Sequence, residues 1–222
     1  MARLGSARTG MARPVWALLL ATLALAGCQA GGFATRQPAP QRPPDPTDGL
    51  AAIPPCPTGL VARLNTGVTV AFAGAVPDRP ETCLRRVNGH TYRYFLGFWG
   101  DGAFHDGTAA ERAAIRKVLT GPVGTSASFP LRTASAVALW RSATITHVGD
   151  PTLSLGHGTP RPTMLLLVER RTDAGRDVHT ETLWWLDRAT LVPLQREEVI
   201  PMTHGTERQL AWRVRALAPA SD

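Results

Sequence analysis

The side chains that could carry catalysis or bind a metal in this chain are its histidines, cysteines, serines and acids. Six histidines are spread along the sequence, and no pair has the H-x-x-x-H or H-E-x-x-H spacing that places two zinc ligands on one face of a helix. They are His90, His105, His147, His157, His179 and His204. The spacing therefore predicts no metal site, and a metal-dependent hydrolase is the least favoured function.

Other local groupings of reactive residues have simpler structural interpretations. The glycine-rich loop around Asp101, His105 and Asp106 could collect a cation, but glycine and aspartate also simply build turns. Gly124-Thr-Ser126 lacks the second glycine of a nucleophile elbow, and no phosphate-binding G-x-x-x-x-G-K motif occurs. We therefore expect a protein that is not an enzyme and needs no cofactor.

An export signal occupies the N-terminus. Arg3, Arg8 and Arg13 precede an apolar run over 15–25, which is too short to cross a hydrocarbon core of about 30 Å. The end of this run, Leu25-Ala26-Gly27-Cys28, resembles the lipobox of bacterial lipoproteins. That resemblance implies that the signal is removed and that Cys28 is acylated, for example with palmitate, so that it anchors the protein in a membrane.

Some choices stay open for this segment. Cys28 could be an ordinary cysteine beside a general cleavage site, or the apolar run could remain as an uncleaved anchor. The start is either Met1 or Met11, because Met11 still leaves Arg13 as the positive flank. Gln29 is not the aspartate that the lipoprotein resemblance associates with inner-membrane retention. We therefore expect the protein on the periplasm-facing side of the cell outer membrane, and we favour this location over the inner membrane.

Cys56 and Cys83 remain as a pair if Cys28 takes the lipid. Exported proteins reach an oxidising compartment, where a disulfide is the default state of two such cysteines. The separation is 83 − 56 = 27 residues, and closing such a loop is worth roughly 3 kcal/mol in the chain-entropy picture. Neither cysteine has a further cysteine or a histidine at metal-ligand spacing. We therefore predict a disulfide.

Charge and composition divide the chain into three parts. Removing residues 1–27 lowers the formal charge from +7 to +4, since three arginines and no acids are lost. Residues 28–57 are rich in proline and predict an extended spacer behind the lipid anchor. Residues 58–218 are expected to form a single antiparallel β domain. The absence of an arginine stripe interleaved with aromatics argues against nucleic-acid binding.

Strand signals dominate this domain, so the predicted fold is mainly β (α+β): an antiparallel meander sheet that could curve into a half-barrel. One β-prone run covers 60–72. Residues 82–87 and 90–99 form a predicted hairpin around Asn88-Gly89, a pair that suits a type I′ turn. Alternation in the second arm places Tyr92 and Tyr94 on one face.

One helix is predicted near 109–119, packed on the sheet. Thr108 as N-cap and Glu111 three residues later make a capping box, and Gly121-Pro122 ends the helix. The later strand candidates alternate with turn signals at 173–177 and 187–190. These candidates are 128–132, 136–148, 163–171, 179–187, 191–200 and 209–217. Their order predicts a meander.

The motif Trp185-x-Asp187-x-x-Thr190-x-x-Pro193-Leu194-x-x-Glu197 resembles a strand-turn-strand of the LolA/LolB and RseB-like envelope proteins. In that group an antiparallel sheet curls into a half-barrel over helices, and its concave apolar face takes acyl chains or partner peptides. This chain departs from the group because it predicts one helix where the group has several. The second strand resumes at a proline, which a sheet edge tolerates.

Four large aromatics are candidates for the lining of an apolar ligand site, although aromatics also serve as core: Tyr92, Tyr94, Trp184 and Trp212. We expect a non-catalytic, membrane-anchored envelope lipoprotein that binds a lipid or a hydrophobic peptide on its sheet. The alternative is a structural or assembly lipoprotein that holds envelope proteins by a sheet edge or a basic face.

Overall fold

A computed structural model describes residues 52–100, 106–131, 140–156, 158, 160–172 and 179–220. The predicted signal, Cys28 and most of the predicted spacer lie outside these residues. The elements are β1 (Thr58–Leu64), β2 (Thr69–Val76), β3 (Arg79–Val87), β4 (His90–Phe95), α1 (Ala109–Thr120), β5 (Ser126–Pro130), β6 (Ser142–Gly149), β7 (Thr152–Ser154), β8 (Pro160–Arg171), β9 (His179–Asp187), β10 (Pro193–Met202) and β11 (Gly205–Pro219).

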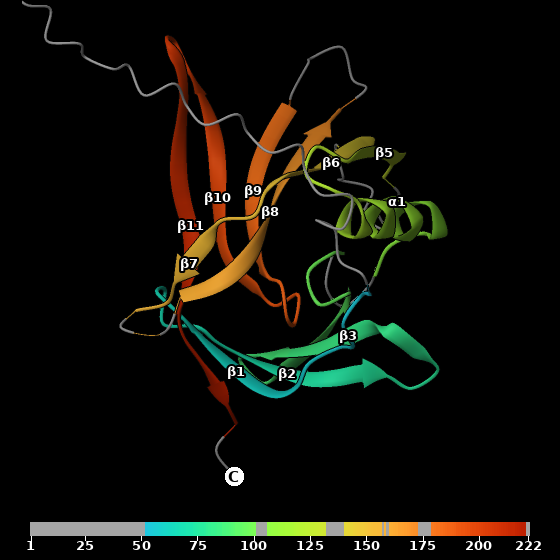
Figure 1. The fold of residues 1–222 in the computed structure, drawn as a ribbon, viewed down its shortest axis with the longest axis vertical. Coiled ribbons are helices and arrows are strands. Elements are labelled where there is room, and N and C mark those ends of the chain that lie inside the picture. The colour runs from blue at the N-terminus through green and yellow to red at the C-terminus, as the bar shows by residue number, and fades with distance from the viewer. Residues whose placement is uncertain are drawn as a thin grey trace, which may run out of the picture. The chain divides into compact units, whose positions relative to one another are not determined.

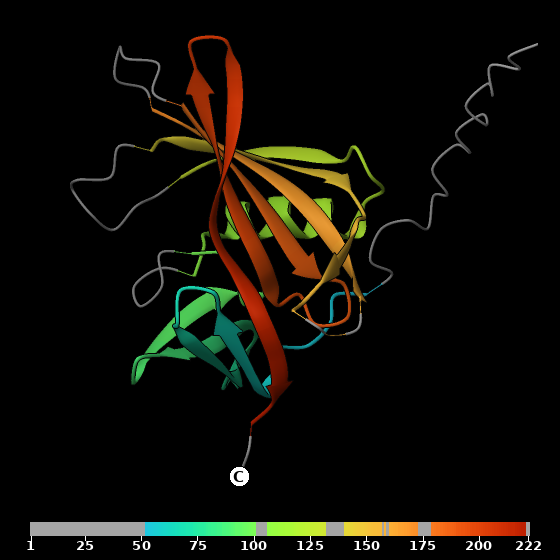
Figure 2. The same cartoon turned by 90° about the vertical axis from the view of Figure 1, so that its left-hand side faces the viewer.

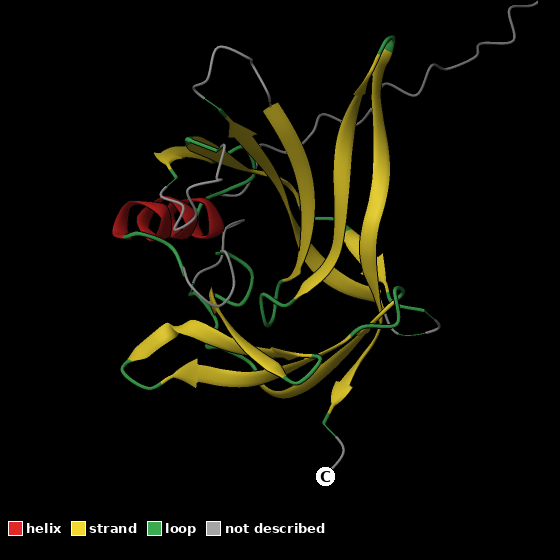
Figure 3. Ribbon diagram, turned by 180° about the vertical axis from the view of Figure 1, so that it is seen from behind, coloured by secondary structure: helices red, strands yellow, loops and turns green. Residues whose placement is uncertain are grey.

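The strands of the described part join into one antiparallel sheet in the order β4-β3-β2-β1-β11-β10-β9-β8-β6-β5, with β7 paired to β8. The long strand β11 makes this continuity possible. Its first part pairs with β10 and its last part with β1, so the sheet bends along β11 and the strands β1–β4 lie across from β8–β10 (Figures 1 and 3). The prediction of a mainly β, curved antiparallel sheet with one helix is confirmed.

Helix α1 forms as the capping signal predicts. The Thr108 hydroxyl accepts a hydrogen bond from the Glu111 amide at 3.2 Å. The side chain of Glu111 takes another role, because it is buried and accepts a hydrogen bond from the Trp99 indole at 3.0 Å. The apolar face of α1, with Ile115, Val118 and Leu119, is fully buried in one of the two cores and lies behind the sheet in Figure 2.

The first half of the sheet contains a confirmed hairpin and two corrections. Asn88 and Gly89 adopt positive φ angles of 50° and 79° between β3 and β4, as a type I′ turn requires. The run 60–72 is not one strand: it folds back at Gly67 (φ 84°) into β1 and β2. Strand β4 ends at Phe95, short of residue 99, because Leu96 and Gly97 turn the chain with positive φ.

In the second half the turn at 187–190 is confirmed. Thr190 donates to the buried Asp187 carboxylate at 2.6 Å. The expectation of a sheet edge is wrong, because β10 lies between β9 and β11; Pro193 is tolerated there as the first residue of its strand. Strand β10 begins at Pro193 and β11 at Gly205, whereas starts at 191 and 209 were predicted. The turn signal at 173–177 lies outside the described residues.

The residues from Met164 to Val168 are all apolar, and their strand, β8, has neighbours on both sides, so both of its faces can be covered. Cys56 and Cys83 form the predicted disulfide, with their Cα atoms 5.3 Å apart. The bond attaches the segment before β1 to strand β3. In the described part of the chain, no helix combines the length and the apolar character needed to cross a membrane.

Candidate functional site

Three strands place an arginine between two tryptophans on one face of the sheet. Arg196 on β10 pairs in register with Trp184 on β9 and with Trp212 on β11. Residues that pair directly across antiparallel strands project to the same side of the sheet. The Trp184 and Trp212 rings are 5.9 Å apart in an edge-on arrangement, and the Arg196 guanidinium lies 5.4 Å from the centre of the Trp184 ring. We call these three residues the upper row.

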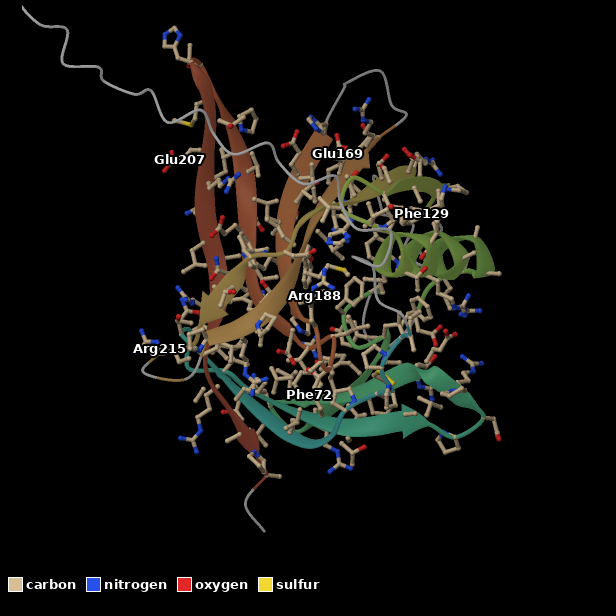
Figure 4. The ribbon with its side chains drawn as sticks, in the orientation of Figure 1. Phe72, Phe129, Glu169, Arg188, Glu207 and Arg215 are labelled. Atoms are coloured by element: carbon tan, nitrogen blue, oxygen red, sulfur yellow. A yellow bond between two sulfur atoms is a disulfide. The ribbon has the colours of Figure 1, made fainter. Side chains whose placement is uncertain are left out.

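The facing strands carry a second row of the same kind. Arg85 on β3 pairs with Phe72 on β2 and with Tyr92 on β4. Its guanidinium lies 5.7 Å from the centre of the Phe72 ring and 4.6 Å from that of Tyr94. Phe72 lies on the side of the strands β1–β3 that faces the rest of the sheet (Figure 4). Phe72, Arg85 and Tyr92 are the lower row.

A groove of about 450 Å³ is lined from both sides of the bent sheet. All four aromatics that the sequence nominates line it, although ligand binding by them stays a prediction. The structure adds Phe98 and Trp99, which lie just after β4. The full lining is Leu64, Val68, Val70, Arg85, Val87, Tyr92, Tyr94, Phe98, Trp99, Gly100, Arg170, Trp184, Arg196 and Trp212.

Phe98 connects the two halves of the lining. Its ring centre lies 6.4 Å from that of Trp184, so residues that follow β4 contact the upper row. Trp99 packs edge-on against Phe129 at 5.4 Å and donates to Glu111, which attaches this segment to α1 and β5. The aromatic lining is thus fixed by contacts to several elements rather than by one strand.

The charged groups of the groove are arginines. Burial lowers the pKa of Arg85 below its ordinary value, and the Tyr94 side chain opposes this shift. Burial also lowers the pKa of Arg170; the neighbouring Arg196 charge adds to this effect, and Glu111 opposes it. The Arg170 guanidinium lies 5.5 Å from the centre of the Trp99 ring. Aromatic faces thus hold partly desolvated cations.

The sequence did not reveal these arginines as site residues. Arginine supplies nearly all the basic residues of the chain, so no single one stands out by type. Phe98 does carry a sequence signal, because the alternation that places Tyr92 and Tyr94 on one face extends to residue 98. Arg85 and Arg196 are recognised as site residues by the aromatic residues that they pair with on neighbouring strands. The sequence does not give this register.

A separate cluster offers metal-binding atoms. Glu169, His179 and Glu181 bring one such atom each within 4.8 Å of one another. The two glutamates face each other across β8 and β9, and His179 Nε2 lies 2.9 Å from Glu181 Oε1 and 3.9 Å from Glu169 Oε1. The imidazole lies beside two carboxylates that face each other across the strands, so contacts among these three side chains account for the cluster. That the protein needs no metal stays a prediction.

The other reactive groups that lie among the described residues make contacts within the fold. Asp101 and His105 lie outside the described residues, and Asp106 accepts a hydrogen bond from Thr82 at 2.8 Å. The Ser126 hydroxyl lies 2.9 Å from that of Thr146 on the neighbouring strand. These contacts serve the fold.

His147 is fully buried. One ring nitrogen lies 2.8 Å from Asp150 and the other lies 3.3 Å from the carbonyl of Gly121. It therefore ties the end of α1 to the end of β6, which is a structural role.

Comparisons with known proteins add a distant likeness of fold. No protein-family model matches this chain, and no curated protein matches its sequence. Among solved structures, the chain is similar to the crystal structure of the hypothetical lipoprotein YmcC from Escherichia coli (K12). The two are 14% identical, the match covers 77% of this chain and 89% of that one, and the TM-score is 0.45.

Proposed function

We propose that this protein is a lipid-anchored envelope protein that binds an acyl chain in the aromatic groove and performs no catalysis. The observation that carries the proposal is that the upper row and two members of the lower row, Arg85 and Tyr92, line one groove of about 450 Å³. Ligand sites of this size are typically concave and mostly apolar, with a few convergent polar groups.

The apolar part of the groove suits a flexible hydrocarbon. Leu64, Val68, Val70 and Val87 add aliphatic side chains beside the aromatic ones. An acyl chain that leaves water for such a surface gains about 0.8 kcal/mol for each buried methylene. A short hydrophobic peptide would use the same surface and is a competing occupant.

The anchoring part of the proposal rests on the sequence. Leu25-Ala26-Gly27-Cys28 directly follows the apolar run, and the proline-rich residues 28–57 would hold the domain away from the bilayer as a semi-rigid spacer. A domain held beside a membrane meets acyl chains at high local concentration. The absence of aspartate after Cys28 supports the outer membrane.

The proposal is tested on the exported Cys28→Ser chain, which lacks the lipid. Binding of a fluorescent fatty acid is titrated, and organic extracts of the purified protein are analysed for acyl species by mass spectrometry. Trp212→Ala should weaken probe binding at least about tenfold, roughly 1.4 kcal/mol. The matched control is Leu210→Ala, on the same strand but 46% exposed and outside the groove, and it should bind normally. Absence of both probe binding and extracted acyl species would contradict the proposal.

One observation favours the alternative of an assembly lipoprotein. The outer part of the β10–β11 hairpin is exposed, with Met202 at 55% and Leu210 at 46%, and its tip points away from the rest of the sheet (Figure 2). Exposed apolar residues on a projecting hairpin suit a protein contact. Loss of a co-purifying envelope protein on the double change Met202→Ser and Leu210→Ser, with probe binding intact, would support this function.

A further inference from the structure

The groove has an uneven charge distribution. Its described lining contains three arginines and no acidic side chain. We propose that the ligand is an anionic amphiphile, whose apolar chain lies on the aromatic residues and whose carboxylate or phosphate is held by Arg170 and Arg196, with Arg85 on the facing wall. This inference rests on the proposed function and names the class of ligand.

Arg196 has hydrogen-bonding capacity that the protein does not use. Stacking on Trp184 occupies the face of its guanidinium, and one donor reaches Glu198 at 3.1 Å. Its Nε–H group is buried and has no acceptor among the described residues. A guanidinium carries five N–H donors at its edge. A buried charged donor without an acceptor is costly, so an acidic oxygen from a ligand would relieve that cost.

Arg170 lies close enough to Arg196 for the two charges to repel, which lowers the Arg170 pKa after the larger effect of burial. The charge of Glu111 compensates this in part. Two neighbouring guanidinium groups are the usual arrangement for binding a carboxylate or phosphate through charge-assisted hydrogen bonds. An anion bound between them would offset this repulsion.

The same two arginines also border a second cavity of about 310 Å³ on the other side. That cavity is lined by Glu181 and Glu198 as well, so its charge is balanced. The excess of positive charge therefore belongs to the groove. An acidic group that enters beside the tryptophans meets three arginines, one of which also pairs with Glu198 at 3.1 Å.

Arg85 extends the positive lining to the opposite wall. It donates to the Gly97 carbonyl at 3.2 Å, and its Nε–H group is buried without an acceptor among the described residues. Its burial lowers its pKa, which marks a desolvated charge that a nearby anion would stabilise. Arg85 and Arg196, each with a buried Nε–H group that has no acceptor among the described residues, thus both line the same groove.

The test compares four amphiphiles of equal chain length on the exported Cys28→Ser chain: dodecanoate, dodecyl phosphate, dodecanol and dodecylamine. Titration calorimetry is done below their micelle concentrations. The two anions should bind at least about tenfold tighter than dodecanol, roughly 1.4 kcal/mol, and dodecylamine should bind most weakly. The ratio between dodecanoate and dodecyl phosphate identifies the preferred acid. Inorganic phosphate alone should not displace either anion, because it lacks the chain.

Variants assign the preference to residues. Arg170→Met and Arg196→Met keep the apolar stem but remove the charge, so the anions should lose their advantage while dodecanol binding stays unchanged. Arg215→Met is the matched control, since Arg215 is an exposed arginine of β11 away from the groove (Figure 4). It should retain the full preference for anions.

The possible results separate the two proposals. Equal binding of dodecanol and both anions would overturn this inference and leave the proposed function standing. Failure of all four amphiphiles to bind would instead contradict the proposed function. The comparison on the unsubstituted groove decides the question even where an arginine variant does not fold. Displacement of the anions by inorganic phosphate alone would show that the chain contributes nothing, which also counts against the inference.

Discussion

Trp184 and Arg196 lie directly opposite each other on β9 and β10, with the guanidinium 5.4 Å from the centre of the indole ring. This pair links the apolar and the charged properties of the groove. The tryptophan ring covers part of Arg196 without accepting a hydrogen bond from it, and the buried Nε–H group has no acceptor among the described residues. The same pairing recurs between Arg85 and Phe72 on the facing strands.

The contact between Trp184 and Arg196 should be measurable as a coupling free energy. Trp184→Ala, Arg196→Ala and the double variant are unfolded in urea, and the coupling is expected to be about 0.5–1 kcal/mol, as for partly exposed cation–π pairs. The control cycle joins Arg196→Ala with Lys117→Ala, an exposed residue of α1. Additive changes in the first cycle would show that the two side chains are neighbours without interaction.

The disulfide should stabilise the fold by restricting the unfolded chain. Cys56→Ala is expected to lower the free energy of unfolding by roughly 3 kcal/mol under oxidising conditions, from the loop of 27 residues. Reductant should bring the unsubstituted protein to the level of the variant. Cys56 is the better position for this test, because Cys83 is only 1% exposed and its replacement would also alter packing. An equal loss on substitution in reductant would refute the effect.

Acid should weaken the ion pair between Glu81 on β3 and Arg116 on α1. The hydrogen bonds from Arg116, one of them at 2.6 Å, hold the pKa of Glu81 below its ordinary value despite the opposing effect of burial. A depressed folded-state pKa stabilises the fold above the unfolded-state pKa, and this gain is lost as pH falls below about 4 through the folded-state pKa.

Glu81→Gln should therefore reduce stability near neutral pH and flatten the loss in acid. The side chains of the pair are 36% and 40% exposed, so solvent screening limits the effect to less than about 1 kcal/mol. Urea unfolding at several pH values measures it. Glu207→Gln, at the outer end of β11 (Figure 4), is the control. Parallel pH curves for the Glu81 variant and the unsubstituted protein would contradict the assignment.

The anchor predicts a change of location. Cys28→Ser should move the exported protein from the membrane fraction to the soluble periplasmic fraction, because the acylated thiol would be lost. Cys56→Ala should leave the protein in the membrane fraction and acts as the matched cysteine control. Mass spectrometry of the N-terminal peptide should show an acylated Cys28. An unmodified thiol there would remove the basis of the anchoring proposal.

Local rules succeeded where neighbouring residues decide the structure. Asn88-Gly89 determines the turn between β3 and β4 because both residues accept positive φ. Thr108 and Glu111 start α1 because the cap satisfies a free amide within one turn. The prediction of one strand over 60–72 was wrong although a local signal was present: Asn65 and Gly67 both favour turns, and the chain reverses at these residues.

The sequence alone determined the class of the fold, the helix, the disulfide pair and four aromatic residues of the groove. The alternation of apolar residues and the helix cap depend on residues that are close together in the chain, and the disulfide depends on residue type and number. These features can therefore be predicted from the sequence. Only the tertiary structure shows that Trp184, Arg196 and Arg85 line the same groove. This arrangement depends on the register of β9, β10 and β11 and on the pairing of β11 with β1. The pairing of β11 with β1 joins residues at least 214 − 64 = 150 positions apart, and the energy of such contacts appears only when both faces are buried together.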